Sequence, residues 1–109
     1  MQEFILVQTS TDSKEAAQKI ADAIVRGRLA ACCWVSGPII STYWWQGKLE
    51  NAQEWVCSFK THRGLYDELE QAIKAVHSYE VPEIVATPIV AGSQSFLDWI
   101  IEETTKSGD

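Results

Sequence analysis

The aromatic tract Tyr43-Trp44-Trp45, followed by Gln46-Gly47, constrains the fold of this chain more than any other segment. Successive residues of a β-strand point to opposite faces of the sheet, so three consecutive rings cannot all enter one core. The chain has 109 residues, and a domain of that size has little interior to spare on both faces of a sheet. We therefore expect one face of the tract to pack on the chain's own helices and the other on a second copy of the chain.

Charge and cysteine content narrow the partners and the compartment. The formal net charge of -6 argues against nucleic acid or an anionic membrane as the main partner. The three cysteines, of which Cys32 and Cys33 are adjacent, suit reduced thiols in the cytoplasm better than a disulfide framework. No apolar run approaches the roughly 20 residues that span a bilayer, and no basic region precedes the first apolar stretch as in a signal peptide. We expect one cytoplasmic domain over residues 1–109.

The hydrophobic periodicity predicts elements in the order β-α-β-β-α-β-α. The expected strands cover residues 4–8, 29–43, 49–61 and 83–90, and the expected helices begin near residues 12, 63 and 93. Asp12 and Glu15 have the spacing of a capping box at the first helix, and Gly27 suits a left-handed cap at its end. Ser93 or Ser95 is expected to cap the terminal helix.

This order is that of a ferredoxin-like α+β fold, βαββαβ, with an additional C-terminal helix. Its antiparallel sheet carries both inner helices on one face, and a long hairpin joins the second and third strands. We expect a bend at Gly37-Pro38, because proline cannot donate to a ladder, and a tight turn at Gln46-Gly47-Lys48. The opposite face of the sheet is left bare, so a partner should cover it.

Several segments carry a resemblance to a known family. They occur in order over essentially the whole chain: Leu29-Ala30-Ala31-Cys32, Ser41 to Glu50, Phe59-Lys60-Thr61, His77 with Tyr79 to Ile84, and Gly92 with Phe96 to Trp99. In these segments the chain resembles the CutA family of divalent-cation tolerance proteins. The resemblance implies a ferredoxin-like subunit that forms a tight homotrimer by exchanging long hairpin strands. It also implies a role in tolerance to copper and other divalent ions. Trp34 departs from the family's usual Asn.

The resemblance places two candidate copper ligands at Cys32 and His77. Thiolate and imidazole both suit copper, and we expect at most a weakly bound copper ion and no required cofactor. Cys33 cannot join Cys32 around one ion easily, because adjacent strand residues point to opposite faces. The alternatives are that each cysteine is a small buried hydrophobe and that His77 interacts with the last carbonyls of its helix. Two ligands per chain require a neighbouring subunit or solvent to complete the coordination.

A second candidate site is a small-ligand cleft between subunits, as in the PII signalling proteins that the trimer resembles. Its residues would be Trp45, Lys60, Tyr79 and Glu83, with His77 beside them. A ring surface, a cation, a base and a carboxylate are a mixture typical of a binding pocket. The alternative is that Lys60 and Glu83 form an ion pair across the sheet and that the rings only pack.

Catalytic residues are not expected. Glu80 and Glu83 lie three residues apart in a proline-containing segment, and no nucleophile–base pair or phosphate-binding loop accompanies them. Together with the role that the resemblance implies, this favours a homotrimeric protein of divalent metal tolerance that is not an enzyme. A PII-like small-molecule sensor and a structural or adaptor trimer are the alternatives.

Overall fold

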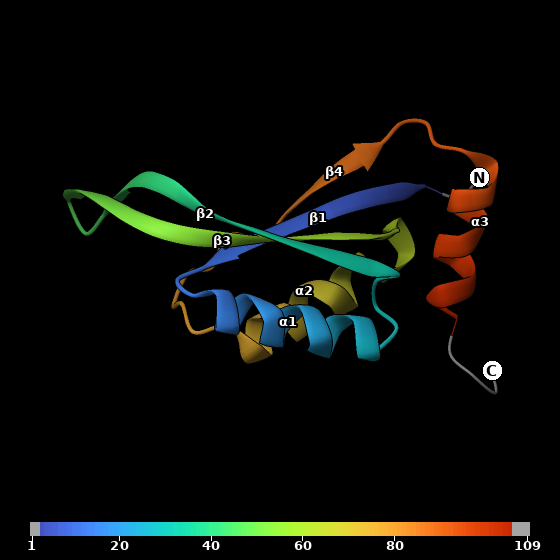
Figure 1. Cartoon of the computed structure of the whole chain (residues 1–109), viewed down its shortest axis with the longest axis horizontal. Coiled ribbons are helices and arrows are strands. Elements are labelled where there is room, and N and C mark those ends of the chain that lie inside the picture. The colour runs from blue at the N-terminus through green and yellow to red at the C-terminus, as the bar shows by residue number, and fades with distance from the viewer. Residues whose placement is uncertain (1–2, 106–109) are drawn as a thin grey trace.

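A four-stranded antiparallel sheet with the order β2-β3-β1-β4 organises the fold. The computed structural model describes residues 3–105 (Figure 1). Its strands are β1 (Phe4–Thr11), β2 (Cys32–Trp45), β3 (Lys48–His62) and β4 (Val85–Ile89). Its helices are α1 (Lys14–Arg26), the short 3-10 helix η1 (Arg63–Leu65), α2 (Tyr66–Val76) and α3 (Gln94–Glu103).

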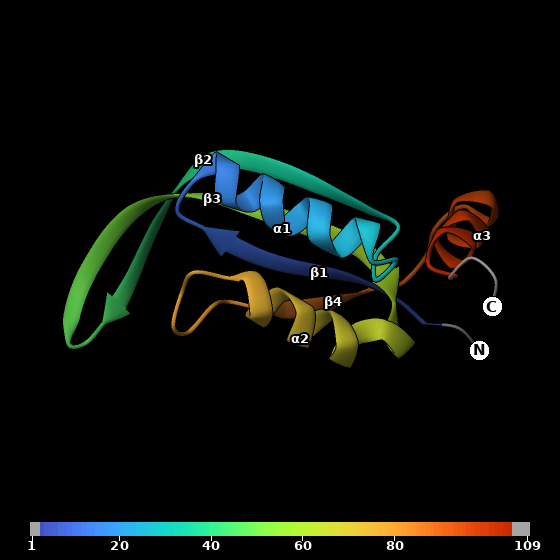
Figure 2. The same ribbon diagram turned by 90° about the horizontal axis from the view of Figure 1, so that it is seen from below.

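Helices α1 and α2 lie side by side on one face of the sheet, and α3 lies at one end of it (Figures 1 and 2). This arrangement confirms the expected mixed sheet-and-helix plan. Strand β4 is an edge strand, which suits Pro88, a residue that has no amide hydrogen for a further strand.

The core fills the space between the sheet and the two helices. Strand β1 alternates strictly, with buried residues on the helix side and partly exposed residues on the other side. The buried apolar side chains come from the sheet and from both helices: Ile5, Val7, Cys57, Phe59, Ala17, Ile20, Ile24, Leu69 and Ile73. Burying one of the larger side chains, such as Phe59 or Ile20, contributes about 1.5–3 kcal/mol, so this layer is a major source of stability.

The ends of the helices differ in detail from the sequence prediction. Ser13, not Asp12, caps α1, and its Oγ accepts a hydrogen bond from the Ala16 amide at 3.0 Å. Gly27 has a φ of -77°, and the left-handed conformation falls on Arg28, with a φ of 61°. Ser93 caps α3, as one of the two predicted choices. These shifts of one residue leave the helices in their expected places.

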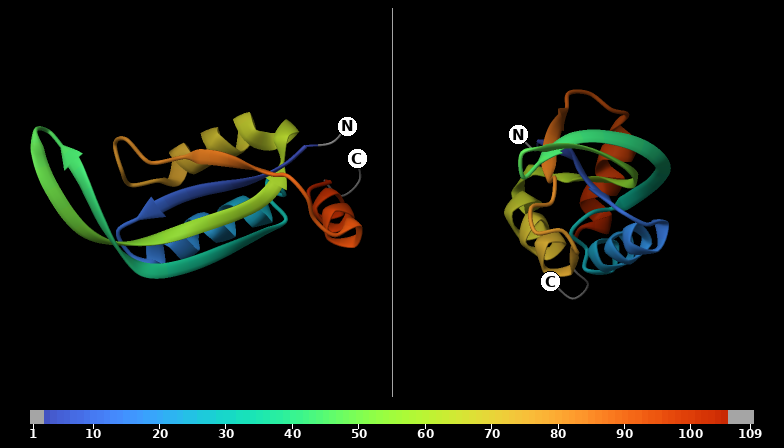
Figure 3. Two further views of the ribbon diagram at one scale, coloured as in Figure 1. Left: turned by 90° about the horizontal axis from the view of Figure 1, so that it is seen from above. Right: turned by 90° about the vertical axis from the view of Figure 1, so that its left-hand side faces the viewer.

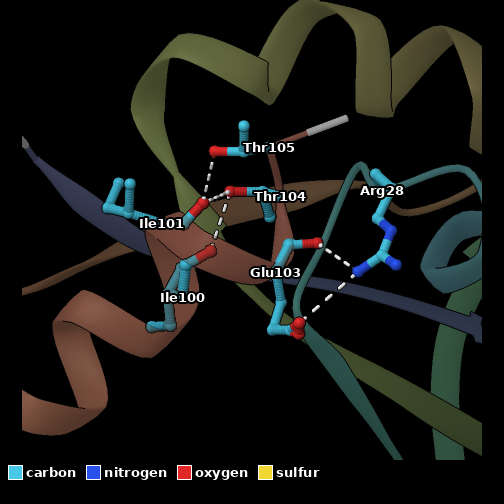
Figure 4. A network of polar contacts seen from close by, with 6 residues as sticks. All are labelled: Arg28, Ile100, Ile101, Glu103, Thr104 and Thr105. Atoms are coloured by element: carbon cyan, nitrogen blue, oxygen red, sulfur yellow. Dashed lines mark hydrogen bonds and ion pairs between the residues drawn. The ribbon is translucent and has the colours of Figure 1, made fainter. Parts of the chain in front are cut away.

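Helix α3 is tied to the connection between α1 and β2 (Figure 4). Arg28 Nη1 donates to the Glu103 carbonyl at 3.2 Å and lies 3.5 Å from its carboxylate. Thr104 Oγ1 donates to the Ile100 carbonyl at 2.8 Å, which satisfies an acceptor at the helix end. Because the Arg28 and Glu103 side chains are well exposed to solvent, their ion pair contributes little to stability.

A β-bulge separates the sheet from a projecting arm, which we define as residues 39–54. The pairing of β2 with β3 shifts between Ser36 and Ile39, at the predicted bend. Gly37 has a φ of 151°, and a Cβ there would lie 2.7 Å from Trp55 Cδ1. Gln46 and Gly47 form the tip, with φ of 50° and 80°, which matches a two-residue hairpin turn. The molecule measures 46 × 28 × 22 Å, with the arm at one end (Figure 3).

The arm exposes its apolar side chains. Trp44 is 72% exposed and Ile40 is 78% exposed. The aromatic tract lies beyond the helices, so the expectation that one of its faces packs on them is wrong (Figure 2). The helices are too short to reach it, and both faces of the arm are left for other contacts.

The sheet face opposite the helices is also open, as expected. Trp34 is 67% exposed there, and Lys60 Nζ lies 3.9 Å from the centroid of its ring. In antiparallel register Trp34 pairs with Ser58, and Lys60 pairs with Cys32 on one side and Leu6 on the other. Within residues 3–105 no helix covers this face (Figure 1).

Candidate functional site

A cleft lies between the arm and the segment that joins α2 to β4. It has a volume of about 690 Å³. Figure 2 shows the arm curving toward this segment. Four aromatic residues line it: Tyr43, Trp44, Trp45 and Tyr79. By strand alternation Tyr43 and Trp45 lie on the same face of the arm as Glu54, and Trp44 lies on the other face. The bulge at Gly37 bends the arm at its base, so the local chemistry of β2 helps to position this aromatic wall.

Glu54 lies at the inner end of the cleft and is the residue that sequence reasoning missed. It is only 6% exposed. Tyr79 Oη donates to Glu54 Oε2 at 2.7 Å, and Ser10 Oγ donates to the same oxygen at 3.5 Å. Burial, with a smaller contribution from Glu54, raises the pKa of Tyr79, so its hydroxyl stays a donor over the physiological range. Strand alternation could have indicated where Glu54 lies, because it puts Glu54 on the same face of β3 as Val56, Ser58 and Lys60.

His77 is held on both sides of its ring. Its Nε2 lies 2.8 Å from the Ser10 carbonyl oxygen, which can only accept, so Nε2 carries the hydrogen. Its Nδ1 accepts a hydrogen bond from the Tyr79 amide at 3.1 Å. His77 thus fixes the start of the segment that carries Tyr79, and its two nitrogens are already in use. The ring does not interact with the last carbonyls of α2, which was the alternative role.

A single chain does not bring Cys32 and His77 together. Cys32 pairs with Lys60 of β3, and Lys60 pairs in turn with Leu6 of β1, whereas the His77 ring contacts Ser10 at the other end of β1. Leu6 and Ser10 are four residues apart, which corresponds to about 13 Å along the strand. Within residues 3–105, no group of three or more histidine, cysteine and carboxylate side chains is placed to hold a metal ion. A copper site that uses both residues therefore needs more than one subunit.

The structure divides the predicted cleft residues. Trp45, Tyr79 and Glu83 line one cleft within the chain, whereas the prediction was a cleft between subunits. Lys60 does not line it and lies instead on the open face of the sheet, against Trp34. The alternative pairing of Lys60 with Glu83 is not formed either, since the Lys60 ammonium lies over the ring.

The three cysteines are free and have different surroundings. Cys57 is fully buried, and its Sγ donates to the Ala17 carbonyl at 3.3 Å, as expected of a small core residue. A hydrogen bond with Cys57 raises the pKa of Cys33 far above the ordinary range of a thiol. Cys32 is half-buried and, by strand alternation, points to the open face of the sheet, away from the other two.

Among the described residues, the helices are too short or too polar to cross a bilayer. Figure 1 shows them packed against the sheet or its end.

Comparison with known proteins gives one consistent family. Residues 5–103 match the family model described as CutA1 divalent ion tolerance protein. The divalent-cation tolerance protein CutA of Thermus thermophilus is 41% identical over 104 residues, which are 95% of this chain and 99% of that protein. The chloroplastic protein CutA 1 of Oryza sativa subsp. japonica is 38% identical over 94% of this chain, and the chain spans 58% of its length.

Solved structures agree with the sequence comparison. The crystal structure of CutA1 from Oryza sativa has a TM-score of 0.92 and 37% identity, covering 96% of each chain. The periplasmic divalent cation tolerance protein CutA from Archaeoglobus fulgidus has a TM-score of 0.88 and 40% identity, covering 96% of this chain and 100% of the other.

Proposed function

The chain belongs to the CutA1 divalent ion tolerance family, and from that membership we propose that it acts in copper tolerance as a homotrimer that binds copper weakly. The observation that carries the proposal is the match over residues 5–103. The proposal assigns no reaction to the chain. It includes a reducing compartment, the cytoplasm, because three cysteines, two of them adjacent, suit reduced thiols better than a disulfide framework.

The exposed arm supports self-assembly. Large apolar side chains crowd both of its strands: Ile39, Ile40, Tyr43, Trp44, Trp45 and Leu49. A surface of this kind on a small protein marks an interaction site, and aromatic residues are enriched in interface cores. The number of three subunits comes from the family resemblance.

The copper ligands would come from different subunits. Cys32 is half-buried and points to the open sheet face that a neighbour would cover. For His77 to ligate, it must give up one of its two hydrogen bonds, to Ser10 or from Tyr79. This cost predicts a weak site in which the Cys32 thiolate, a ligand that favours Cu(I), contributes most.

A copper titration of the assembled protein tests the proposal. Copper near the tryptophans should quench their fluorescence, and Cys32→Ser should weaken this binding. Cys33→Ser is the matched control, because its thiol points to the other face of the same strand. Binding should also weaken as the pH is lowered, because protons compete with the metal ion for its ligands. If Cys32→Ser and a Cys32→Ser/His77→Ala double variant titrate as the parent does, the proposed ligands are wrong.

A second candidate function is a small-molecule sensor, with metal effects that are indirect. The cleft favours it, because Trp45, Tyr79 and Glu83 line one cavity with a buried carboxylate at its inner end. Cavities with apolar rings and a few convergent polar groups are the usual form of a ligand site. A sensor would keep its response to a metabolite in the Cys32→Ser variant, whereas a copper binder would lose its response to copper.

A further inference from the structure

The charge of the cleft is one-sided. Its lining includes three carboxylates, those of Glu54, Glu80 and Glu83, and no lysine, arginine or histidine of the described residues. The basic residue named for this site in the sequence, Lys60, lies elsewhere, against Trp34. A cleft with only negative charges favours a positively charged occupant.

Glu54 makes this preference specific. Its side chain is nearly removed from solvent, and burying a carboxylate is costly unless it is paired. Both hydrogen bonds that the structure gives it, from Tyr79 and Ser10, end on Oε2, and both donors are neutral hydroxyls. Its second oxygen can accept from a ligand at the inner end of the cleft. A cation there would compensate the negative charge of the Glu54 carboxylate, which the two neutral hydroxyls stabilise only by hydrogen bonding.

The rings decide between kinds of cation. The aromatic residues that share the cleft with Glu54, namely Tyr43, Trp45 and Tyr79, offer rings but no oxygen ligands other than two phenolic hydroxyls. A hard metal ion takes about six oxygen ligands, and the three carboxylates are not gathered closely enough to hold one. Aromatic rings beside a carboxylate are instead the surroundings that favour a substituted ammonium group.

We propose that the cleft between the arm and the α2–β4 segment binds an organic cation, a substituted ammonium group whose charge faces Glu54 and whose carbon atoms contact the rings of Tyr43 and Trp45. The proposal rests on the second candidate function, since it names the class of ligand for the same cleft. Tyr79 is a positioning residue, because its hydroxyl holds the Glu54 carboxylate at 2.7 Å.

The test compares three probes of similar size and different charge on the full-length assembled protein. Tetramethylammonium is positive, tert-butanol is neutral and pivalate is negative, and each is titrated at constant ionic strength. The signals are the indole N–H resonances of the tryptophans, which report weak binding residue by residue. We expect tetramethylammonium to shift the resonance of Trp45 more than that of Trp44, which lies on the other face of the arm. Tert-butanol should shift the Trp45 resonance at least about tenfold less at equal concentration, and pivalate should not shift it.

Glu54→Gln removes the charge and keeps an acceptor for Tyr79, so it should weaken tetramethylammonium binding about tenfold or more. Glu102→Gln makes the same change in net charge on α3, at the other end of the molecule, and should leave binding within about twofold of the parent. Light scattering confirms that each variant assembles. Should Glu54→Gln fail to assemble, Glu83→Gln, on the exposed part of the lining, takes its place with a smaller expected loss.

The outcomes distinguish the claim that the ligand is a cation from the claim that the cleft binds a small molecule at all. Equal binding of tert-butanol and tetramethylammonium would overturn the cationic class and leave the cleft as a ligand site. No response to any probe would overturn the ligand class and the sensor function together, as would a cleft filled by a cationic side chain of a neighbouring copy. The copper titration tests the first candidate function, copper binding, independently of both claims about the cleft.

Discussion

Two threonines in the same buried layer differ in whether their hydroxyls have partners. Thr61 Oγ1 donates to the Leu29 carbonyl at 2.8 Å, which ties β3 to the segment before β2. Thr9 Oγ1 has no partner in the described part of the chain, although Thr9 is 1% exposed. A buried hydroxyl without a partner costs free energy, whereas a bonded one contributes a net gain.

We therefore expect opposite results from the same substitution at these positions. Thr61→Val should lower the free energy of unfolding by about 1–3 kcal/mol, because the Leu29 carbonyl loses its donor. Thr9→Val should leave it unchanged or raise it by about 1 kcal/mol. Urea denaturation at one fixed protein concentration measures both. A loss in Thr9→Val as large as that in Thr61→Val would show that Thr9 has a partner, such as an ordered water.

His62 gives the fold a dependence on pH. Burial lowers the pKa of His62 in the folded state below its ordinary value of 6.5. When the pH falls through about 6.5, the unfolded chain takes up a proton that the folded chain does not, so stability decreases and levels off below the folded pKa. We expect His62→Gln to lose less stability than the parent between about pH 7.5 and pH 5.5. Equal losses in denaturation series at the two pH values would contradict this assignment.

The residue scale is also where sequence reasoning was least exact. Asp12 and Ser13 are both good caps, and only the backbone conformation of Ser13 decides between them. Glu54 carries no motif, and its importance arises from Tyr79 and Ser10, which lie far from it along the chain. Contacts of this kind depend on the register of β1 with β3, which spacing within one strand does not reveal.

At the scale of elements, the lengths of the strands and helices explain the arm. Strand β2 has 14 residues and β3 has 15, whereas α1 has 13. A strand rises about 3.3 Å per residue and a helix about 1.5 Å, so β2 extends roughly 46 Å and α1 only about 20 Å. The hairpin must therefore project beyond the helices. The turn and the bulge were predicted from sequence, and this comparison of lengths would have placed the aromatic tract on the projecting part.

Two glycines of the hairpin should respond differently to alanine. Gly37 and Gly47 both have positive φ, which strains any other residue. At Gly47 an added Cβ meets nothing within 4 Å, but at Gly37 it would lie 2.7 Å from Trp55 Cδ1 and 2.9 Å from the Glu54 carbonyl. Gly47→Ala should cost about 1–3 kcal/mol, and Gly37→Ala should cost more. Thermal denaturation under identical conditions ranks them, and the reverse order would show that the bulge adapts.

At the scale of the whole molecule, the antiparallel sheet and the placement of α1 and α2 on one of its faces were predicted from the order and periodicity of the elements. The candidate site followed only in part. Trp45, Tyr79 and Glu83 meet in one cleft, but Lys60 points to the open face. The proposed pairing of Cys32 with His77 between subunits would depend on an assembly that no pattern within one chain can specify.

The exposure of two tryptophans predicts which one supports assembly. Trp44 is 72% exposed on the arm, whereas Trp99 is 37% exposed and stacks on Phe96 with ring centroids 5.5 Å apart. If neighbours bury the arm, Trp44→Ala should cost about 3–5 kcal/mol of assembly free energy, and Trp99→Ala should cost less. The concentration at which each variant dissociates gives the comparison. Equal effects would show that the arm is not the main contact.

The most direct test of the account is the mass of the full-length protein in solution. Light scattering behind a sizing column, at micromolar concentration, should give the mass of three chains, because the exposed arm and the open sheet face each need a covering surface. In denaturant, loss of that mass should coincide with loss of tryptophan fluorescence, because burial between subunits holds the arms in place. A stable, folded species with the mass of one chain would contradict the account.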